Sequence, residues 1–385
     1  MPRVVHVITT LHPGGAELFL ARLLLCEPKL AEGAHVICMG DGGPVAEALK
    51  SGGIRVSTLG MDRSPKAAWG VMRARSLVAA WRPDMVQTWL YHADLLGTLA
   101  AASRAPVVWN LRDAAIDAAH LRRTTALVMR TCASISRWAP ARIVCCSRAS
   151  MEEHTRLGYD ARKMTVIRNG FDLRRFRPRQ GPLGPLRQEC RLPKDALAVG
   201  LFARWHPKKN HLAFLRAMGG LLRADPRLHL VLAGRGVCPG NSALRAAAEA
   251  TGAAERVHLL GHRDNVDKLF PMLDVLVSAS SSEGMPNVVG EAMACGVPCV
   301  VTDVGDSAYL VGNTGRVVPA GDDPALVAAV AEVAYLPQAE RASLGASARR
   351  RIIERFSLEA SASRYLSLYE EVSRQPRGWR RATRP

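Results

Sequence analysis

Short runs rich in β-branched residues alternate with longer Ala- and Leu-rich segments, and this alternation occurs twice along the chain. Such a rhythm is typical of β-α-β units, in which helices cover both faces of a parallel sheet. The chain is therefore predicted to be α/β, with two doubly wound domains facing a central cleft. Strands are predicted at 4–9, 35–39, 54–58, 85–89, 106–109, 142–146, 165–167, 198–202, 229–233, 257–260, 275–278 and 298–302. Helices are predicted at 16–25, 45–51, 67–81, 93–102, 210–223, 242–251, 288–294 and 324–333.

The length of 385 residues fits two or three domains at roughly 150 residues each. Residues 171–195 are rich in Arg and Pro and are interpreted as a linker, so the first domain is placed at 1–178 and the second at 179–357. Apolar residues recur at helical spacing in 358–373, which predicts a terminal helix that packs back on the first domain. Residues 374–385 form a basic tail.

The chain carries 52 Lys and Arg against 34 Asp and Glu, a formal net charge of +18. Residues 1–178 hold 25 basic and 14 acidic residues, and residues 179–373 hold 22 basic and 20 acidic ones. The tail adds five arginines and no acid. A near-neutral second half argues against nucleic acid bound along the whole molecule. The one-sided charge fits a face turned toward an anionic partner, either a membrane or nucleic acid, or else an arginine-rich surface that only confers solubility.

Composition excludes several classes of protein. Hydrophobic residues make up 48% and charged residues 22%, which is typical of globular chains. No apolar run reaches the roughly 18 residues that a membrane span requires, and the N-terminal run is interpreted as a buried strand rather than a signal peptide. The nine cysteines include no C-x-x-C pair, so we expect a reduced, cytoplasmic protein without a metal site.

Loops that follow strands carry the chemistry in open α/β sheets. Gly14 and Gly15 precede a helix, where backbone amides and the helix N-terminus can approach an anion, although a glycine pair after a strand is more often just a tight turn. Arg204 and Lys209 follow the first strand of the second domain and could neutralise a diphosphate, or simply form a solvated basic turn.

The most informative loop runs from Ser278 to Gly296 and holds two acids, Glu283 and Glu291. A carboxylate can accept hydrogen bonds from two neighbouring hydroxyls, so two acids can hold the two ends of a sugar nucleotide. Backbone amides at the start of the helix after Pro286 would face an anion. Two solvated glutamates are hard to reconcile with the Ala, Val, Met and Gly around them.

Together these motifs resemble retaining glycosyltransferases of family 4, which have the GT-B fold of two Rossmann-like domains. The E-x(7)-E pattern is Glu283 to Glu291, the R-x(4)-K pattern is Arg204 to Lys209, and the glycine loop is Gly14-Gly15. The segment 166–178 is similar to the family's hinge-side signature. The match covers nearly the whole chain in order, with members of O-antigen or exopolysaccharide assembly looking most alike. Ala203 and Asn210 depart from the pattern, since many members have glycine there.

The resemblance implies a role for each matching residue. Arg204 and Lys209 would bind the donor diphosphate, Glu291 the ribose, and Glu283 the transferred sugar. Backbone amides near Met285, Pro286, Asn287 and Val288 would complete that pocket, and Gly234 and Gly236 would line the nucleotide or only form a turn. Gly14 and Gly15 would close over the phosphates. His92, after a first-domain strand, would face the reaction centre, although on its own it suits an ordinary helix start.

The resemblance implies a reaction that retains anomeric configuration and moves a sugar from a nucleotide sugar, with a UDP-sugar favoured over a GDP-sugar. The sequence contains no D-x-D motif, so the leaving group would be neutralised by Arg204, Lys209 and helix N-termini without a metal or other cofactor. The acceptor would be a saccharide or lipid-linked saccharide in cell-surface polysaccharide biosynthesis.

The excess charge lies in the half that binds the acceptor in this family. Residues 120–140 combine arginines with apolar residues, which indicates either a helix lying on an anionic membrane or a core helix with a basic face. A peripheral position on the cytoplasmic leaflet is therefore hypothesised. Two other functions stay open: a sugar-nucleotide epimerase of the same fold, and a nucleic-acid-binding module, which would leave Glu283 and Glu291 without a role.

Overall fold

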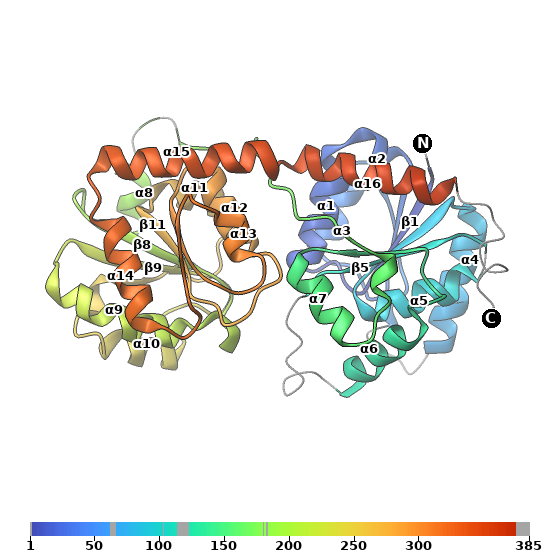
Figure 1. Cartoon of the computed structure of the whole chain (residues 1–385), viewed down its shortest axis with the longest axis horizontal. Coiled ribbons are helices and arrows are strands. Elements are labelled where there is room, and N and C mark those ends of the chain that lie inside the picture. Colours follow the sequence, from blue (N-terminus) through green and yellow to red (C-terminus); the bar gives the residue numbers. More distant parts are fainter. Residues whose placement is uncertain are drawn as a thin grey trace. The chain divides into compact units, whose positions relative to one another are not determined.

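The computed structural model of the chain describes residues 2–61, 67–102, 104–113, 123–179, 181 and 184–374. It divides into two compact units, one made of Met1–Gly170 with Leu358–Pro385 and the other of Phe171–Ser357. Each unit is built on one parallel sheet with helices packed against it (Figure 1). The predicted α/β class, with two doubly wound Rossmann-like domains, is confirmed.

The first unit contains a seven-stranded parallel sheet in the order β3-β2-β1-β4-β5-β6-β7. Strand β1 pairs with a neighbour on each side, so that Val4 lies opposite Ala34 of β2 and Met85 of β4. Strands covered on both faces have no solvent side, which explains why β1, β2, β4 and β5 are buried throughout. The strands are β1 (Val4–Ile8), β2 (Ala34–Cys38), β3 (Arg55–Thr58), β4 (Met85–Trp89), β5 (Val107–Leu111), β6 (Arg142–Cys145) and β7 (Met164–Val166).

Two layers of helices cover this sheet, each over its own hydrophobic core. Helices α1 and α3 contribute to the core that includes Phe19, Leu24 and Leu49. Helices α4, α5 and α6 contribute to the core that includes Val78, Leu96 and Met129. The helices are α1 (Gly15–Cys26), α2 (Pro28–Glu32), α3 (Pro44–Ser51), α4 (Ala67–Trp81), α5 (Tyr91–Ala101), α6 (Arg123–Ile135), α7 (Arg148–Arg156) and the 3-10 turn η2 (Ala161–Lys163).

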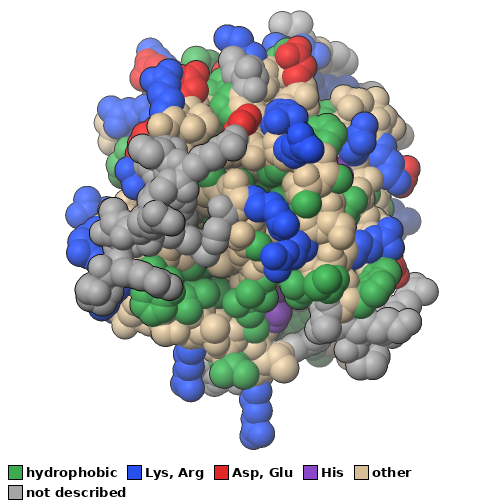
Figure 2. Space-filling view, turned by 90° about the vertical axis from the view of Figure 1, so that its right-hand side faces the viewer, with side chains coloured by type: hydrophobic (Ala, Val, Ile, Leu, Met, Phe, Trp, Pro, Cys, Tyr) green, Lys and Arg blue, Asp and Glu red, His purple; other side chains and the backbone are tan. Residues whose placement is uncertain are grey.

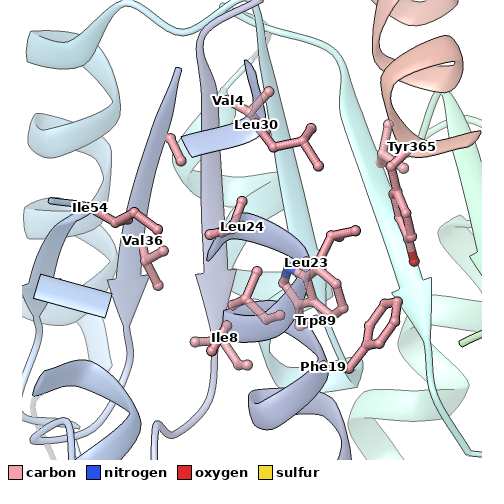
Figure 3. Packing of buried hydrophobic residues seen from close by; sticks show 14 of the residues in the cluster. Val4, Ile8, Phe19, Leu23, Leu24, Leu30, Val36, Ile54, Trp89 and Tyr365 are labelled. Atoms are coloured by element: carbon pink, nitrogen blue, oxygen red, sulfur yellow. The ribbon is translucent and has the colours of Figure 1, made fainter. Parts of the chain in front are cut away.

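The last helix of the described chain, α16 (Leu358–Ser373), belongs to the first unit although it follows the whole of the second. It packs along α1 and places Tyr365 beside Trp89 and Phe19 (Figure 3). The Tyr365 hydroxyl accepts a hydrogen bond of 2.9 Å from the Asn110 side chain. The C-terminal helix is therefore part of the core of the first unit.

The second unit contains a six-stranded parallel sheet in the order β10-β9-β8-β11-β12-β13. Its strands are β8 (Leu197–Phe202), β9 (Leu228–Ala233), β10 (Val257–Leu259), β11 (Val275–Ser278), β12 (Cys299–Thr302) and β13 (Arg316–Val318). Its helices and turns are α8 (Gly184–Glu189), η3 (Pro207–Lys209), α9 (His211–Ala224), α10 (Ser242–Glu249), η4 (Ala254–Arg256), α11 (Val266–Leu269), η5 (Phe270–Met272), α12 (Asn287–Ala294), α13 (Ser307–Val311), α14 (Asp323–Ala334) and α15 (Gln338–Arg355).

The boundary between the units lies at Gly170 and Phe171, eight residues before the predicted boundary at 178. Phe171 and Phe176 are buried in the core of the second unit, so the start of the predicted linker is part of that unit. The Phe171 ring fills the space beside Gly290, where a Cβ atom would lie 2.0 Å from the ring. The Phe171 N–H also donates to the carbonyl of Phe356, which joins the two ends of the unit.

Several other elements differ from the sequence-based expectations. The structure adds β13 and the helices α2, α7, α8, α11, α13 and α15 to the predicted elements, and the basic helix expected within 120–140 is α6. Residues 114–122 and 375–385, which include Arg122 and nearly all of the basic tail, lie outside the described residues. Among the described helices, none is long and apolar enough to cross a membrane.

Candidate active site

The loop after β8 carries both predicted phosphate-binding cations, Arg204 and Lys209. The Arg204 side chain is exposed and pairs with no carboxylate of the described residues. Lys209 ends the short turn η3 and is held more closely, because the Lys208 carbonyl accepts a hydrogen bond from the Ser281 N–H. The β8 loop is thus fixed to the loop that follows β11.

The departure from the family pattern at Asn210 has a structural explanation. Asn210 has φ +53° and ψ +34°, the left-handed conformation that glycine adopts freely and asparagine tolerates better than most residues. Its side-chain amide also donates to the carbonyl of Ala279 at 3.0 Å. Asparagine therefore keeps the required backbone turn and adds a second connection to the loop after β11.

Lys209 and Glu283 form an ion pair at the carboxyl end of the second sheet. Their side chains are only 22% and 12% exposed, so the pair is largely shielded from solvent. The Ser280 hydroxyl donates to the same carboxylate oxygen of Glu283 at 2.7 Å. Thr302 in turn donates to the Ser280 carbonyl at 2.6 Å. This network brings two of the four predicted catalytic residues into contact and holds Glu283 in one orientation.

Helix α12 begins directly after this network, with Pro286 as its N-cap residue and Asn287 as its first residue. Its first amides have no partners within the helix, and its dipole favours an anion at that end. Pro286 has no N–H, so only Met285, Asn287 and Val288 of the predicted group can donate. Glu291, one turn further along, is 8% exposed and lies within the unit's interior.

Glycines support these loops through close backbone approaches. Gly305 has φ +60°, and a Cβ atom there would lie 2.0 Å from the carbonyl oxygen of Glu283. Gly234 has φ +153°, and its Cβ would lie 2.0 Å from the carbonyl oxygen of Ala203, next to Arg204. Gly236 has φ +78°, and its Cβ would lie 2.9 Å from the side chain of Trp205. Gly234 and Gly236 therefore shape the Arg204 loop, which is a structural role that the sequence left open.

In the first unit, the predicted glycine loop caps α1: Gly14 is the N-cap residue and Gly15 the first helical residue. Glu17 follows in the first turn of α1. A Cβ atom on Gly14 would lie only 2.4 Å from a carboxylate oxygen of Glu17. Burial raises the pKa of Glu17, while a hydrogen bond to its own backbone and the nearby His12 oppose this shift. A side chain at Gly14 would thus displace a buried carboxyl group from the start of the helix.

His92 lies at the second position of α5, directly after β4. Its imidazole is half-buried and makes no hydrogen bond with the described residues, and burial lowers its pKa. Leu90, two residues earlier, has φ +72° and ψ +162°, a conformation nearly restricted to glycine. The Leu90 N–H donates to the Asn110 carbonyl at 3.1 Å. The backbone that presents His92 is therefore strained and held by the neighbouring strand.

Tyr91 and Asp94 fix the same turn of α5. The Tyr91 hydroxyl lies 2.9 Å from Nε2 of His154, whose Nδ1 lies 2.7 Å from the Ser150 carbonyl. This arrangement makes His154 a neutral acceptor, consistent with its lowered pKa. Asp94 is fully buried and accepts a 2.5 Å hydrogen bond from the Thr88 hydroxyl, and burial raises its pKa.

Arg112, at the end of β5, was not singled out by the sequence. Its guanidinium group lies 4.2 Å from the centre of the Phe19 ring and donates to the Asn169 side chain and, at 3.5 Å, to the Tyr365 hydroxyl. Asn169 is buried, so its place in the hinge-side signature is explained by this contact. Ser280, Thr302 and Gly305 were likewise missed as supports of Glu283, because their roles depend on contacts between loops.

Two family models match the chain. The model described as Glycosyltransferase Family 4 matches residues 13–175, and the model described as Glycosyl transferases group 1 matches residues 193–334. The first match includes the glycine loop and His92. The second includes the Arg204 loop and both glutamates. The two matches fall one on each half of the chain, as the family resemblance implies.

Curated relatives agree with these matches. The chain is 32% identical over 220 residues to the lipopolysaccharide core biosynthesis mannosyltransferase LpsB of Rhizobium meliloti, covering 54% of the chain and 61% of that relative. It is 29% identical over 340 residues to the corresponding enzyme LpcC of Rhizobium leguminosarum bv. viciae, covering 83% of the chain and 88% of that relative. The chain thus spans less than two thirds of LpsB and most of LpcC.

Among solved structures, HepE of Anabaena in complex with UDP has a TM-score of 0.84 at 22% identity, covering 96% of this chain and all of HepE. The same protein has also been solved with UDP-glucose. At this identity the likeness establishes the fold. With two family models matched and both Rossmann-like units present, the chain belongs to the family 4 glycosyltransferases and has the GT-B fold.

Proposed function

We propose that this protein is a retaining glycosyltransferase that moves a sugar from a nucleotide-sugar donor to a saccharide or lipid-linked saccharide acceptor in cell-surface polysaccharide biosynthesis. The observation that carries the proposal is the contact between Lys209 and Glu283, fixed by Ser280 and lying in the same unit as the exposed Arg204. This unit matches the family model that includes the second half of the chain.

The cations of the second unit suit the departure of a nucleoside diphosphate. When the bond from the sugar to the diphosphate breaks, negative charge grows on the leaving oxygen and must be stabilised. Arg204 has no carboxylate partner among the described residues, so its charge is available to a phosphate. Lys209 and the first amides of α12 add further donors. We propose that these groups replace a metal ion in the reaction.

The two glutamates suit neutral hydroxyl groups rather than phosphates. Glu283 keeps one carboxylate oxygen bound by Lys209 and Ser280, which orients the carboxylate for the hydroxyls of the transferred sugar. Glu291 would hold the ribose. Retention would follow if the acceptor hydroxyl attacks on the face from which the diphosphate leaves, with the leaving oxygen taking the proton. Glu283 then positions the sugar without bonding to it.

We assign His92 a role near the transferred sugar and Gly14 and Gly15 a role near the phosphates. The lowered pKa of His92 keeps its imidazole neutral at physiological pH, so it can exchange hydrogen bonds without placing a second positive charge at the site. We propose that the reaction takes place in the cytoplasm, because the proposed donor is a nucleotide sugar. A UDP-sugar is the favoured donor because HepE binds UDP and UDP-glucose.

Thermal-shift measurements with UDP-, GDP- and ADP-sugars test the donor. A shift with UDP-sugars alone supports the proposal, whereas a shift with none of the three contradicts it. Release of free nucleotide is then followed with and without saccharide acceptors. Release that requires the acceptor identifies a transferase, and release or conversion of the donor without any acceptor identifies an epimerase or hydrolase instead.

A further inference from the structure

The exposed hydrophobic side chains of the first unit gather on one layer of helices. Of the six large exposed hydrophobic residues that the structure describes in this unit, five lie on α4, α5, α6 or in the turn after α6. These three helices are neighbours, since α5 packs against both α4 and α6. The five residues are Trp69, Met72, Leu99, Leu127 and Trp138, which are 49–67% exposed. In the second unit, the large exposed hydrophobic residues among those described lie on six separate segments.

Arginines lie among these hydrophobic residues at helical spacing. On α4, Arg73 follows Trp69 by one turn, and its guanidinium group lies 5.1 Å from the centre of the Trp69 ring. On α6, Arg123, Leu127 and Arg130 form one exposed stripe that continues into the turn at Arg137 and Trp138. Each stripe therefore presents positive charge and apolar surface together.

Acidic residues are almost absent from these helices. Residues 67–139 contain nine arginines, four aspartates and no glutamate. The only acid within α4, α5 or α6 is Asp94, which is buried and points away from solvent. On the surface turned toward the viewer in Figure 2, blue arginine and lysine side chains lie among green hydrophobic ones, and red acidic ones are few.

We propose that the outer face of α4, α5 and α6, called here the α4–α6 face, binds the surface of a membrane that contains anionic lipids. The proposal rests on the proposed function, because an acceptor carried on a lipid must be reached at a membrane. Aromatic and aliphatic side chains would enter the boundary between headgroups and acyl chains. The arginines would stay at the level of the lipid phosphates.

A groove beside α6 extends this face. It has a volume of about 740 Å³ and is lined by Ser134 and Arg137 on one side and by Gly158–Arg162 on the other. Arg162 is neutralised by Asp160 at 2.8 Å, whereas Arg137 pairs with no carboxylate of the described residues. A lipid phosphate would find an uncompensated positive charge at this edge of the α4–α6 face.

Two other occupants fit the face less well. A second copy of the chain would bring like-charged arginines together, which opposes association through this face. Nucleic acid would satisfy the arginines, but Met72, Leu99 and Leu127 offer neither charge nor a ring on which bases stack. A lipid surface satisfies both kinds of side chain at once.

Flotation with vesicles tests the proposal on the full chain. One set of vesicles is phosphatidylcholine, and the other is phosphatidylcholine with an equal amount of phosphatidylglycerol. We expect stronger binding to the anionic vesicles, weakened by salt. Leu127→Ser should weaken binding about tenfold by loss of apolar burial. Arg130→Gln should weaken it about fivefold by loss of one charge at the surface.

Matched variants in the second unit are the controls. Ile353→Ser and Arg350→Gln change residues of the same kinds, also exposed, on α15, and should leave vesicle binding unchanged. The proposal is overturned if the α15 variants weaken vesicle binding as much as Leu127→Ser and Arg130→Gln do. It is also overturned if the protein shows no preference for anionic vesicles. A dimer in solution that Leu127→Ser dissociates, or a nucleic acid that competes off the vesicles, overturns it as well.

The UDP thermal shift keeps this test separate from the proposed function. UDP should raise the melting temperature of Leu127→Ser and Arg130→Gln as much as that of the unaltered protein. Both residues lie on α6 in the first unit, whereas the proposed donor site lies in the second unit. If UDP does not change the melting temperature but vesicle binding still requires Leu127, the proposed function is contradicted and membrane binding by the α4–α6 face is supported. A normal UDP shift with vesicle binding independent of both residues would contradict the face alone.

Discussion

The two units share a parallel-sheet design, but several of their shielded carboxylates are held in different ways. In the second unit, the shielded carboxylates of Glu283 and Asp274 each pair with a cation: Lys209 binds the first, and Arg187 and Arg341 bind the second. In the first unit, Asp94 and Glu17 are buried without a Lys or Arg partner among the described residues, and burial raises the pKa of both.

This difference separates two kinds of work. A paired carboxylate remains charged and can hold a cation or hydroxyl in place, which suits a site that receives a charged donor. An unpaired buried acid tends toward its neutral form and serves as a hydrogen-bonding anchor, as Asp94 does for Thr88. Glu283 is thus arranged for electrostatic binding, and Asp94 for holding the strained turn at Leu90.

The largest expected effect comes from removing a cation in each unit. Lys209→Ala or Arg204→Ala should raise the barrier of sugar transfer by about 2–4 kcal/mol, because each removes charge stabilisation of the leaving diphosphate. Arg112→Met, the counterpart in the first unit, should instead lower the free energy of unfolding by about 1–3 kcal/mol, since it removes the charged hydrogen bond from Arg112 to buried Asn169. Turnover kinetics and urea unfolding measure the two effects.

Arg216→Ala serves as the control for these variants, because Arg216 is an exposed cation on α9 in a surface pair with Asp323. It should change neither quantity measurably. Near-normal transfer by both Lys209→Ala and Arg204→Ala would remove the distinction between the units. A loss of turnover in Arg112→Met at unchanged stability would place substrate binding in the first unit as well.

A smaller effect is expected at the glycine that backs the Glu283 loop. Gly305→Ala places a methyl group against a backbone oxygen at positive φ, and should cost about 2–3 kcal/mol of stability and weaken donor binding. Gly321→Ala is the matched control, with φ +83° but open space around the added atom. Its cost should be about 1 kcal/mol, from the backbone alone. Equal costs would show that the loop yields to the methyl group.

A further effect, shared by both units, is sensitivity to acid. Burial lowers the pKa of His6 to about 3 and those of His35, His211 and His258 to about 4. The folded protein keeps these groups neutral while the unfolded chain protonates them, so their stabilisation is complete above about pH 6.5 and is lost as the pH falls toward 4.

Each of these histidines contributes a slope of about 1.4 kcal/mol per pH unit in that window. Urea unfolding between pH 7 and pH 4 measures it. His6→Gln keeps an acceptor for the Trp89 indole but cannot be protonated, so its stability should depend less steeply on pH than that of the unaltered protein. An unchanged dependence would mean that His6 is not desolvated.

The sequence predicted the fold class and most of the strands because their signal is local. Buried parallel strands are continuous apolar runs, and every strand but β13 was expected close to its observed position. Strand β13 has three residues at the edge of its sheet and too little apolar surface to stand out. Helix α15 was missed because it packs through small residues: a Cβ on Gly345 would lie 1.9 Å from the Gly296 carbonyl oxygen.

The candidate site was predicted in its parts but not in its assembly. Arg204, Lys209, Glu283 and Glu291 stand out because charged residues follow strands in otherwise apolar surroundings. The structure adds the contact between Lys209 and Glu283 and its supports at Ser280, Thr302 and Gly305. No spacing along the chain encodes those contacts, since they join loops up to 74 residues apart. The chemical roles of these residues remain predictions for the variants above.

The return of α16 to the first unit has a consequence for how the chain folds as it is synthesised. The second unit is one continuous stretch, Phe171–Ser357, and is complete before α16 leaves the ribosome. The first unit lacks the cover over Phe19 and Trp89 until Tyr365 is made. The half that is translated first is therefore the half that finishes folding last, and a nascent chain must keep this apolar face from aggregating until α16 has been made.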